Sequence, residues 1–145
     1  MMDTLKVLHT NCPNKYFSAS IKLEATSNNL EYGFVLYYDE SNFIGLGFKN
    51  NKIYTIQKGE KGKGPTLKNE NFKYVQLTRN NNDLQMAFSS DGISWYYYPM
   101  GKEVSGYQHN MLGNFRNLKL GIFCRGKGTL KIDDFVFTNN LASQN

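Results

Sequence analysis

Five acidic residues are the first candidates for chemistry: Asp39, Glu40, Asp91, Asp133 and Asp134. Hydrolysis of a glycosidic bond needs two carboxyl groups that face each other across a cleft. The first three residues lie in predicted turns, where an Asp side chain normally accepts hydrogen bonds from its own backbone. Asp133 and Asp134 interrupt an apolar strand, which indicates either a β-bulge or ligands for a structural cation, and the pattern favours the bulge. The sequence therefore predicts no catalytic pair of carboxylates.

Histidine and cysteine are too scarce for most other catalytic or metal-binding chemistry. The chain has two of each, His9 and His109, and Cys12 and Cys124. This inventory argues against a His-based triad, a His-rich metal site and a cysteine metal cluster. A disulfide between Cys12 and Cys124 is one alternative, but we expect free thiols that pack as small apolar side chains. We expect no cofactor, with a structural calcium ion as the one alternative.

Aromatic side chains are the remaining chemical signal, at 14% of the chain. In an extended segment 95–98, Trp95 and Tyr97 point to one face, and Tyr96 and Tyr98 point to the other. Aromatic rings stack on the apolar face of a sugar while polar neighbours bond its hydroxyl groups. The alternative is that these rings pack inside the sheets. The predicted carbohydrate-binding candidates are Tyr37, Phe43, Tyr96, Tyr98 and Arg125.

The elements that must position these residues are short strands. Residues 16–25 alternate apolar and polar side chains, which is the period of a half-buried strand. Residues 42–49 place Ile44, Leu46 and Phe48 on one face, and only Phe43 and glycines on the other, so a neighbour or a ligand packs closely there. The Asp91–Gly92 pair predicts a type I′ hairpin turn, and residues 100–115 form a long connection. The other predicted strands are 31–39, 52–57, 72–78, 84–89, 93–98, 117–125 and 129–138.

Length and composition indicate one all-β domain. The 145 residues are 40% hydrophobic and rich in Tyr and Phe, which favour strands. Regularly spaced short strands joined by tight turns predict a β-sandwich or a barrel. We expect residues 1–15 to be a leader or a first edge strand, 16–138 the sandwich domain and 139–145 a tail.

A net charge of +5 raises nucleic acid as a partner. The one dense lysine run, residues 58–65, is rich in glycine and broken by Glu60, which is typical of a solvated loop. The first residues contain no apolar run long enough for a signal peptide or a membrane span. We therefore expect no nucleic acid and no membrane, and a cytoplasmic location unless the chain is part of a longer protein.

Three strings, in consistent order, resemble one family. YGFVLYYDESNFIGLGF, residues 32–48, resembles a strand–turn–strand segment of the concanavalin A-like β-sandwich at the C-terminus of family 43 glycoside hydrolases, of the β-xylosidase and arabinofuranosidase type. FSSDGISW, residues 88–95, is similar to the S-x-D-G-x-x-W hairpin of these domains. LGIFCRGKGTLKIDDFVF, residues 120–137, looks like their closing pair of strands. The similarity covers most of the chain.

The resemblance implies a two-sheet antiparallel β-sandwich of the concanavalin A-like jelly-roll type. In the family this sandwich packs on a five-bladed propeller, which holds the catalytic carboxylates and has no counterpart in these 145 residues. The leading hypothesis is a non-catalytic, carbohydrate-associated module of a xylan- or arabinan-degrading glycoside hydrolase. Its expected partners are an oligosaccharide or polysaccharide and a catalytic propeller domain. The alternatives are a stand-alone lectin-like binder, an enzyme on the sandwich itself, and a structural or protein-interaction sandwich.

Overall fold

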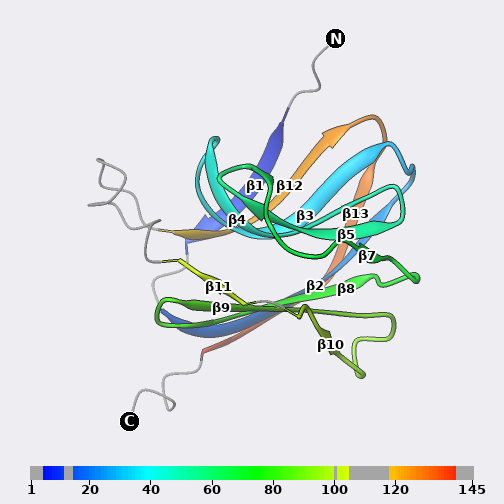
Figure 1. Cartoon of the computed structure of the whole chain (residues 1–145). Helices are drawn as coiled ribbons and strands as arrows, with labels where there is room; N and C mark the ends of the chain where they lie inside the picture. Colours follow the sequence, from blue (N-terminus) through cyan, green and yellow to red (C-terminus); the bar gives the residue numbers. More distant parts are fainter. Residues whose placement is uncertain (1–4, 12–14, 100, 105–117, 140–145) are drawn as a thin grey trace.

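The fold is a sandwich of two antiparallel sheets (Figure 1). The computed structural model describes residues 5–11, 15–99, 101–104 and 118–139. These residues contain strands and no helix, and hence no helix that could span a membrane. In chain order the strands are β1 (Lys6–Asn11), β2 (Tyr16–Ala25), β3 (Leu30–Asp39), β4 (Asn42–Lys49), β5 (Lys52–Gln57), β6 (Glu60–Lys61), β7 (Leu67–Lys68), β8 (Tyr74–Asn80), β9 (Asp83–Ser89), β10 (Tyr96–Tyr97), β11 (Lys102–Glu103), β12 (Lys119–Gly126) and β13 (Leu130–Asn139).

The strand order places both chain-terminal strands at sheet edges. Sheet A runs β1-β12-β3-β4-β5-β6, and β7 also pairs with β5. Sheet B runs β10-β9-β8-β2-β13, and β11 also pairs with β9. Consequently β1 is the edge strand of sheet A, and β13 is an edge strand of sheet B.

The main core lies between the sheets, where alternation directs the apolar side chains. In β2 the residues Phe17, Ala19, Ile21 and Leu23 are each 1% exposed or less. The intervening residues of β2 are half-buried, so the predicted one-sided burial of this strand is confirmed. Burying each large side chain of this kind contributes about 1.5–3 kcal/mol. The other buried members are Phe34, Leu36, Tyr38, Ile44, Leu46, Phe48, Ile53, Val75, Leu77, Leu84, Met86, Phe88, Tyr98, Val104, Leu118 and Leu120.

A bulge in β13 keeps Ile132 and Phe137 on the same face of the strand. Ile132 pairs with Leu23, but between Asp133 and Val136 the register shifts by one residue. Asp134 takes up the extra residue with a φ of 54°. Because one residue of slip moves side chains to the opposite face, the bulge returns Phe135 and the residues after it to correct alternation. The predicted bulge is thereby confirmed.

A second apolar cluster lies on the face of sheet A that points away from sheet B. It consists of Val35, Phe43, Tyr54, Ile56 and Phe123. In the register, Gly33 lies between Phe123 and Gly47, and Gly47 pairs with Tyr54. A Cβ at Gly33 would lie 2.6 Å from the Phe123 ring. At the predicted glycine-lined face, Val35 lies against Gly45, and Tyr54 and Ile56 lie against Gly47, so the close neighbours are residues of the chain itself.

Two local predictions were wrong. The Asp91–Gly92 pair does not form a two-residue type I′ turn, because only Gly92 has a positive φ and Phe88 pairs with Tyr96 across a longer loop. The Asp91 carboxylate accepts hydrogen bonds from the backbone N–H groups of Ile93 and Ser94, and these bonds take the place of strand-to-strand hydrogen bonds. The predicted strand 93–98 is therefore reduced to β10. The predicted connection 100–115 contains the short strand β11, and residues 105–117 lie outside the described part of the chain.

Gly45 tests the close packing of β3 on β4. A Cβ there would lie 2.3 Å from the Phe34 carbonyl oxygen and 2.7 Å from the Val35 Cα. We expect Gly45→Ala to lower the free energy of unfolding by about 2–3 kcal/mol, because backbone atoms cannot move aside cheaply. Urea denaturation measures the change. Gly101→Ala is the matched control, since its nearest atom lies 3.4 Å from the added carbon; equal losses in both variants would contradict this account.

Candidate functional site

The structure does not gather the five predicted carbohydrate-binding residues on one surface. Tyr37 and Phe43 belong to the outer cluster of sheet A, where Phe43 is fully buried. Tyr98 is 4% exposed in the core between the sheets, and its hydroxyl donates to the Pro65 carbonyl oxygen. Tyr96 is 58% exposed at the edge of sheet B. The role of these residues in carbohydrate binding stays a prediction.

Arg125 takes part in an intramolecular polar cluster. Its Nε donates to Glu31, its Nη2 donates to the Gly59 carbonyl oxygen at 3.2 Å, and the Tyr54 hydroxyl donates to the other oxygen of Glu31. The Glu31 side chain is 14% exposed, so this carboxylate needs both partners to offset its desolvation. Burial, and then the bond to Glu31, hold the pKa of Tyr54 far above its usual range. The cluster ties β12, β3 and β5 together across sheet A.

The remaining predicted chemical groups have structural contacts or lie outside the described residues. Asp39 accepts from the Ser41 backbone and the Asn42 amide, which confirms its predicted turn role. The pKa of Asp91 is lowered, chiefly by the backbone N–H groups of Ser94 and Ile93.

His9 stacks on Tyr37 with ring centroids 4.9 Å apart. Among the described residues, no three His, Cys, Asp or Glu side chains lie close enough together to hold a metal ion, and Cys124 is a free thiol. His109 and Cys12 are not among the described residues.

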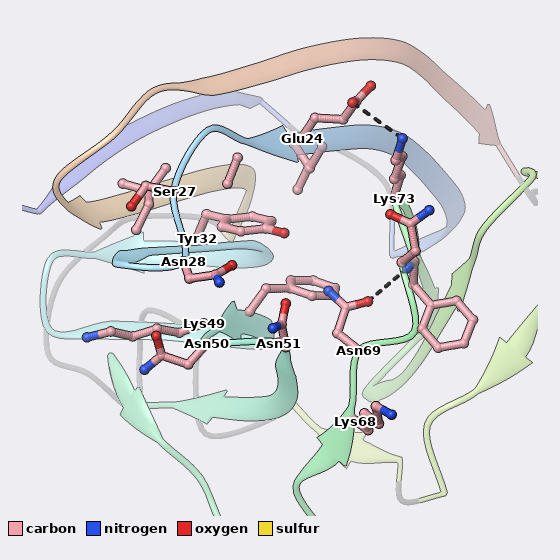
Figure 2. Close-up of a pocket in the computed structure, with 16 residues that line it drawn as sticks. Glu24, Ser27, Asn28, Tyr32, Lys49, Asn50, Asn51, Lys68, Asn69 and Lys73 are labelled. Atoms are coloured by element: carbon pink, nitrogen blue, oxygen red, sulfur yellow. Dashed lines mark hydrogen bonds and ion pairs between the residues drawn. The ribbon is translucent and has the colours of Figure 1, made fainter.

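A polar pocket of about 470 Å³ opens between the sheets at one end of the sandwich, and residue patterns alone did not predict it (Figure 2). We call it the amide pocket, after five asparagines in its wall: Asn28, Asn50, Asn51, Asn69 and Asn71. They come from the β2–β3 turn, the β4–β5 turn and the segment between β7 and β8. On sequence alone these asparagines indicate only turns. Their meeting at one end of the fold is a property of the topology.

Backbone hydrogen bonds join the turns that form the amide pocket. The Asn50 N–H donates to the Asn28 carbonyl oxygen at 3.3 Å, and the Asn69 N–H donates to the Asn51 carbonyl oxygen at 2.7 Å. The Asn69 side-chain oxygen accepts the Phe72 N–H at 2.8 Å. These bonds link the turns to one another, so backbone hydrogen bonds of the fold hold the pocket wall in place.

The amide pocket also has an aromatic wall. Tyr32 and Phe48 stack with centroids 5.2 Å apart and an interplanar angle of 11°. Phe72 lines the same pocket and packs on Tyr96 at 5.6 Å, so Tyr96 is the predicted candidate that approaches this site. Burial raises the pKa of the Tyr32 hydroxyl. The pocket therefore combines flat apolar rings with several amides.

A second surface feature is apolar. Leu8 on β1, Ile122 on β12, and Ile132 and Phe135 on β13 line a groove of about 380 Å³ between the edges of the two sheets, here called the apolar groove. Leu8 is 64% exposed, Ile132 38% and Phe135 50%. Since Ile132 pairs with Leu23 on the inner face of sheet B, the groove exposes a core-type face that sheet A leaves uncovered.

Two antiparallel sheets packed face to face define a β-sandwich domain. Over residues 4–136 the sequence matches the family described as the beta-xylosidase C-terminal concanavalin A-like domain. The chain belongs to this family. The predicted resemblance and the predicted fold class are both confirmed.

The chain is similar in fold to part of several solved structures. A Bacteroides ovatus protein described as xyloglucan PUL GH43B matches with a TM-score of 0.74 at 14% identity, over 92% of this chain and 29% of that one. A xylan beta-1,4-xylosidase from Bacillus halodurans matches with a TM-score of 0.66 at 13% identity, over 90% and 30%. A functionally unknown Saccharomyces cerevisiae protein matches with a TM-score of 0.60 at 13% identity, over 92% and 72%. The chain thus spans about three tenths of the two glycoside-hydrolase structures.

A comparison with curated protein sequences gave no match.

Tyr54 makes the stability of the fold sensitive to alkaline pH. Because its folded pKa lies above the unfolded value, its contribution to stability is present below about pH 10 and is lost as the pH rises further. We expect the free energy of unfolding to fall above about pH 10, and Tyr54→Phe to remove part of that fall. Urea denaturation at neutral and alkaline pH measures both. The exposed Tyr97, changed to Phe, is the matched control; identical pH dependence in the Tyr54 variant and the parent would refute the assignment.

Proposed function

We propose that this chain is a non-catalytic accessory module that docks on a glycoside-hydrolase catalytic domain acting on xylan- or arabinan-type polysaccharide. The observation that carries the proposal is the apolar groove, which leaves a core-type face of β13 open to solvent. Family membership supports it, because the matching domain is described by its place at the C-terminus of a β-xylosidase. The name of the Bacillus halodurans relative supports xylan as the polysaccharide.

The positions of the carboxylates support a non-catalytic role. Asp39 and Asp91 accept hydrogen bonds within their own turns, and Glu31 is bonded to Arg125 and Tyr54. Glu24, the acidic residue in the wall of the amide pocket, is paired with Lys22 and Lys73. Hydrolysis of a glycoside by two carboxyl groups requires a facing pair across a cleft. The described residues place no second carboxylate in the amide pocket.

The chemistry of the apolar groove suits a folded protein surface. Exposed apolar patches bordered by polar residues mark interaction sites in soluble proteins. Leu8 belongs to the edge strand β1 of sheet A, and Ile132 and Phe135 belong to the edge strand β13 of sheet B, so one partner element in the groove would cover the edges of both sheets at once. Such a partner would bury apolar surface that folding of this chain alone leaves in water.

Purified chain is expected to release no nitrophenol from nitrophenyl xyloside or nitrophenyl arabinofuranoside. The physical reason is that Asp39, Asp91 and Glu31 accept hydrogen bonds inside their own turns or clusters. The assay compares the native sample with heat-denatured sample across a range of protein concentrations. Turnover that scales with the amount of protein and survives further purification would show that the chain is an enzyme.

The docking surface is tested with a charge placed in the apolar groove. We expect the chain to form a complex with the family 43 catalytic domain of its source organism, prepared without that domain's own sandwich, and Ile132→Asp to weaken the complex at least about tenfold, because the buried carboxylate would have no partner. Sedimentation velocity measures the association.

Val136→Asp is the matched control for this experiment. Val136 lies on the same strand, is a β-branched aliphatic residue, and is 55% exposed. It pairs with Ser20, on the face of β2 opposite to the core. Absence of a complex, or equal weakening by both variants, would count against docking through the groove.

A further inference from the structure

We propose that the amide pocket binds a short neutral oligosaccharide. This site is separate from the apolar groove, so the proposal does not depend on docking to a catalytic domain. It places carbohydrate binding at the end of the sandwich, between the two sheets, rather than on the outer face of sheet A. The volume of about 470 Å³ falls within the range of about 300–1,000 Å³ typical of small-ligand sites.

Polar groups without intramolecular partners converge on the pocket. Figure 2 shows the carboxamides of Asn28, Asn51 and Asn69 around the same space as the Tyr32 hydroxyl. Among the residues described, the side chains of Asn28, Asn51 and Tyr32 make no hydrogen bond, and Asn69 uses only its oxygen. Each carboxamide offers two N–H donors, and a free carboxamide oxygen accepts as well. Such groups match sugar hydroxyls, which both donate and accept.

Turn geometry explains only part of this asparagine cluster. Asn50, Asn51 and Asn71 have φ values of 53°, 61° and 66°, a backbone conformation in which asparagine is favoured. Asn69 caps the Phe72 N–H with its side chain. Asn28 does not have a positive φ, and its side chain has no bond within the described structure. This exposed amide at the pocket wall is available to a ligand.

The aromatic wall supplies the second element of carbohydrate recognition. Tyr32 and Phe72 are half-buried and line the pocket, and the buried Phe48, which also lines it, stacks on Tyr32. The C–H face of a pyranose or furanose ring packs on such flat apolar surface while its edge hydroxyls reach the amides. Inorganic anions would gain nothing from these rings.

The charges of the pocket favour a neutral ligand. Lys73 is paired with Glu24 at 3.5 Å, and Lys22 approaches the same carboxylate at 3.4 Å. In Figure 2 the ammonium group of Lys49 points away from the carboxamides of Asn28, Asn51 and Asn69. With Lys49 directed away, the exposed Lys68 is the remaining lysine of the described pocket wall that has no ion pair. A single lysine does not make an anion site, whereas it readily donates to a hydroxyl group.

The test is isothermal titration calorimetry with xylotetraose, arabinotetraose and a xyloglucan oligosaccharide. The three variants are Asn28→Ala, Tyr32→Phe and Asn51→Gly. The first two remove a polar group without changing the backbone, and glycine at position 51 keeps the positive φ while deleting the amide. Each variant is expected to weaken binding of at least one neutral oligosaccharide by about tenfold, the loss that accompanies removal of a hydrogen bond in a desolvated site.

Asn81→Gly is the matched control. Asn81 has a φ of 57° in the β8–β9 turn and does not line the amide pocket, so this change repeats the chemistry of Asn51→Gly elsewhere. Unfolding midpoints of all variants separate loss of binding from loss of fold. Binding that is lost in the three pocket variants and kept in Asn81→Gly supports the proposal.

Three results would overturn this assignment. One is absence of binding to every neutral oligosaccharide, and another is binding that the three pocket variants leave unchanged. The third is tight binding of an acidic sugar, such as a galacturonate trimer, without binding of the neutral ones, which would show that Lys68 and Lys73 determine the ligand. The docking variant Ile132→Asp is expected to keep full oligosaccharide binding, so failure of the docking proposal and failure of this one are distinguishable.

Discussion

The packing of one sheet face against the other is the constraint on which the rest of this structure depends. Alternation in β2 sends Phe17, Ile21 and Leu23 into the core, and this register decides which residues of β8 and β13 lie beside them. In β13 the alternation of the sequence breaks at two consecutive aspartates. The bulge at Asp134 restores it, so the cost of an unusual backbone conformation is offset by the apolar side chains that it keeps on the core side.

The two surfaces with functional chemistry arise where this packing stops. At one end of the sandwich the sheets separate, and turns from both sheets enclose the amide pocket. At the side, β13 extends beyond the cover of sheet A and leaves the apolar groove. Their chemistry is opposite, because polar turns end the strands while apolar alternation continues along β13. The two sites proposed above, one for a sugar and one for a protein partner, therefore lie on different parts of the domain.

On the outer face of sheet A, a strand pattern with glycines is compatible either with a bound ligand or with close packing of neighbouring side chains. A strand face with Gly45 and Gly47 leaves space that either a ligand or a neighbouring side chain fills. Here Val35, Tyr54 and Ile56 fill it, and the Arg125–Glu31–Tyr54 cluster adds a polar link between the strands. The result is a second small core, which explains how a thin sandwich accommodates so many aromatic residues.

Much of the fold follows from the sequence by itself. Period-two alternation in residues 16–25 and 42–49 predicts two strands that the structure contains. The Asn50–Asn51 turn predicts a hairpin and the paired aspartates predict a bulge, and both are present. Each of these features depends on the backbone and on immediate neighbours, so the sequence alone predicts it. The three strings that resemble the family predict that these strands form a two-sheet sandwich. The sequence pattern did not predict the conformation of the Asp91 loop. There the Asp91 carboxylate competes with strand pairing for the backbone N–H groups of Ile93 and Ser94.

The candidate site was decided by tertiary structure alone. Asn28, Asn51 and Asn69 are far apart in the chain and each is typical of a turn, and the exposure of Phe135 depends on how far sheet A extends over β13. Sequence alternation determines which face of a strand is apolar. Whether that face is covered by a sheet, by a ring of a neighbouring strand or by solvent depends on long-range packing, and long-range packing also determines which turns meet.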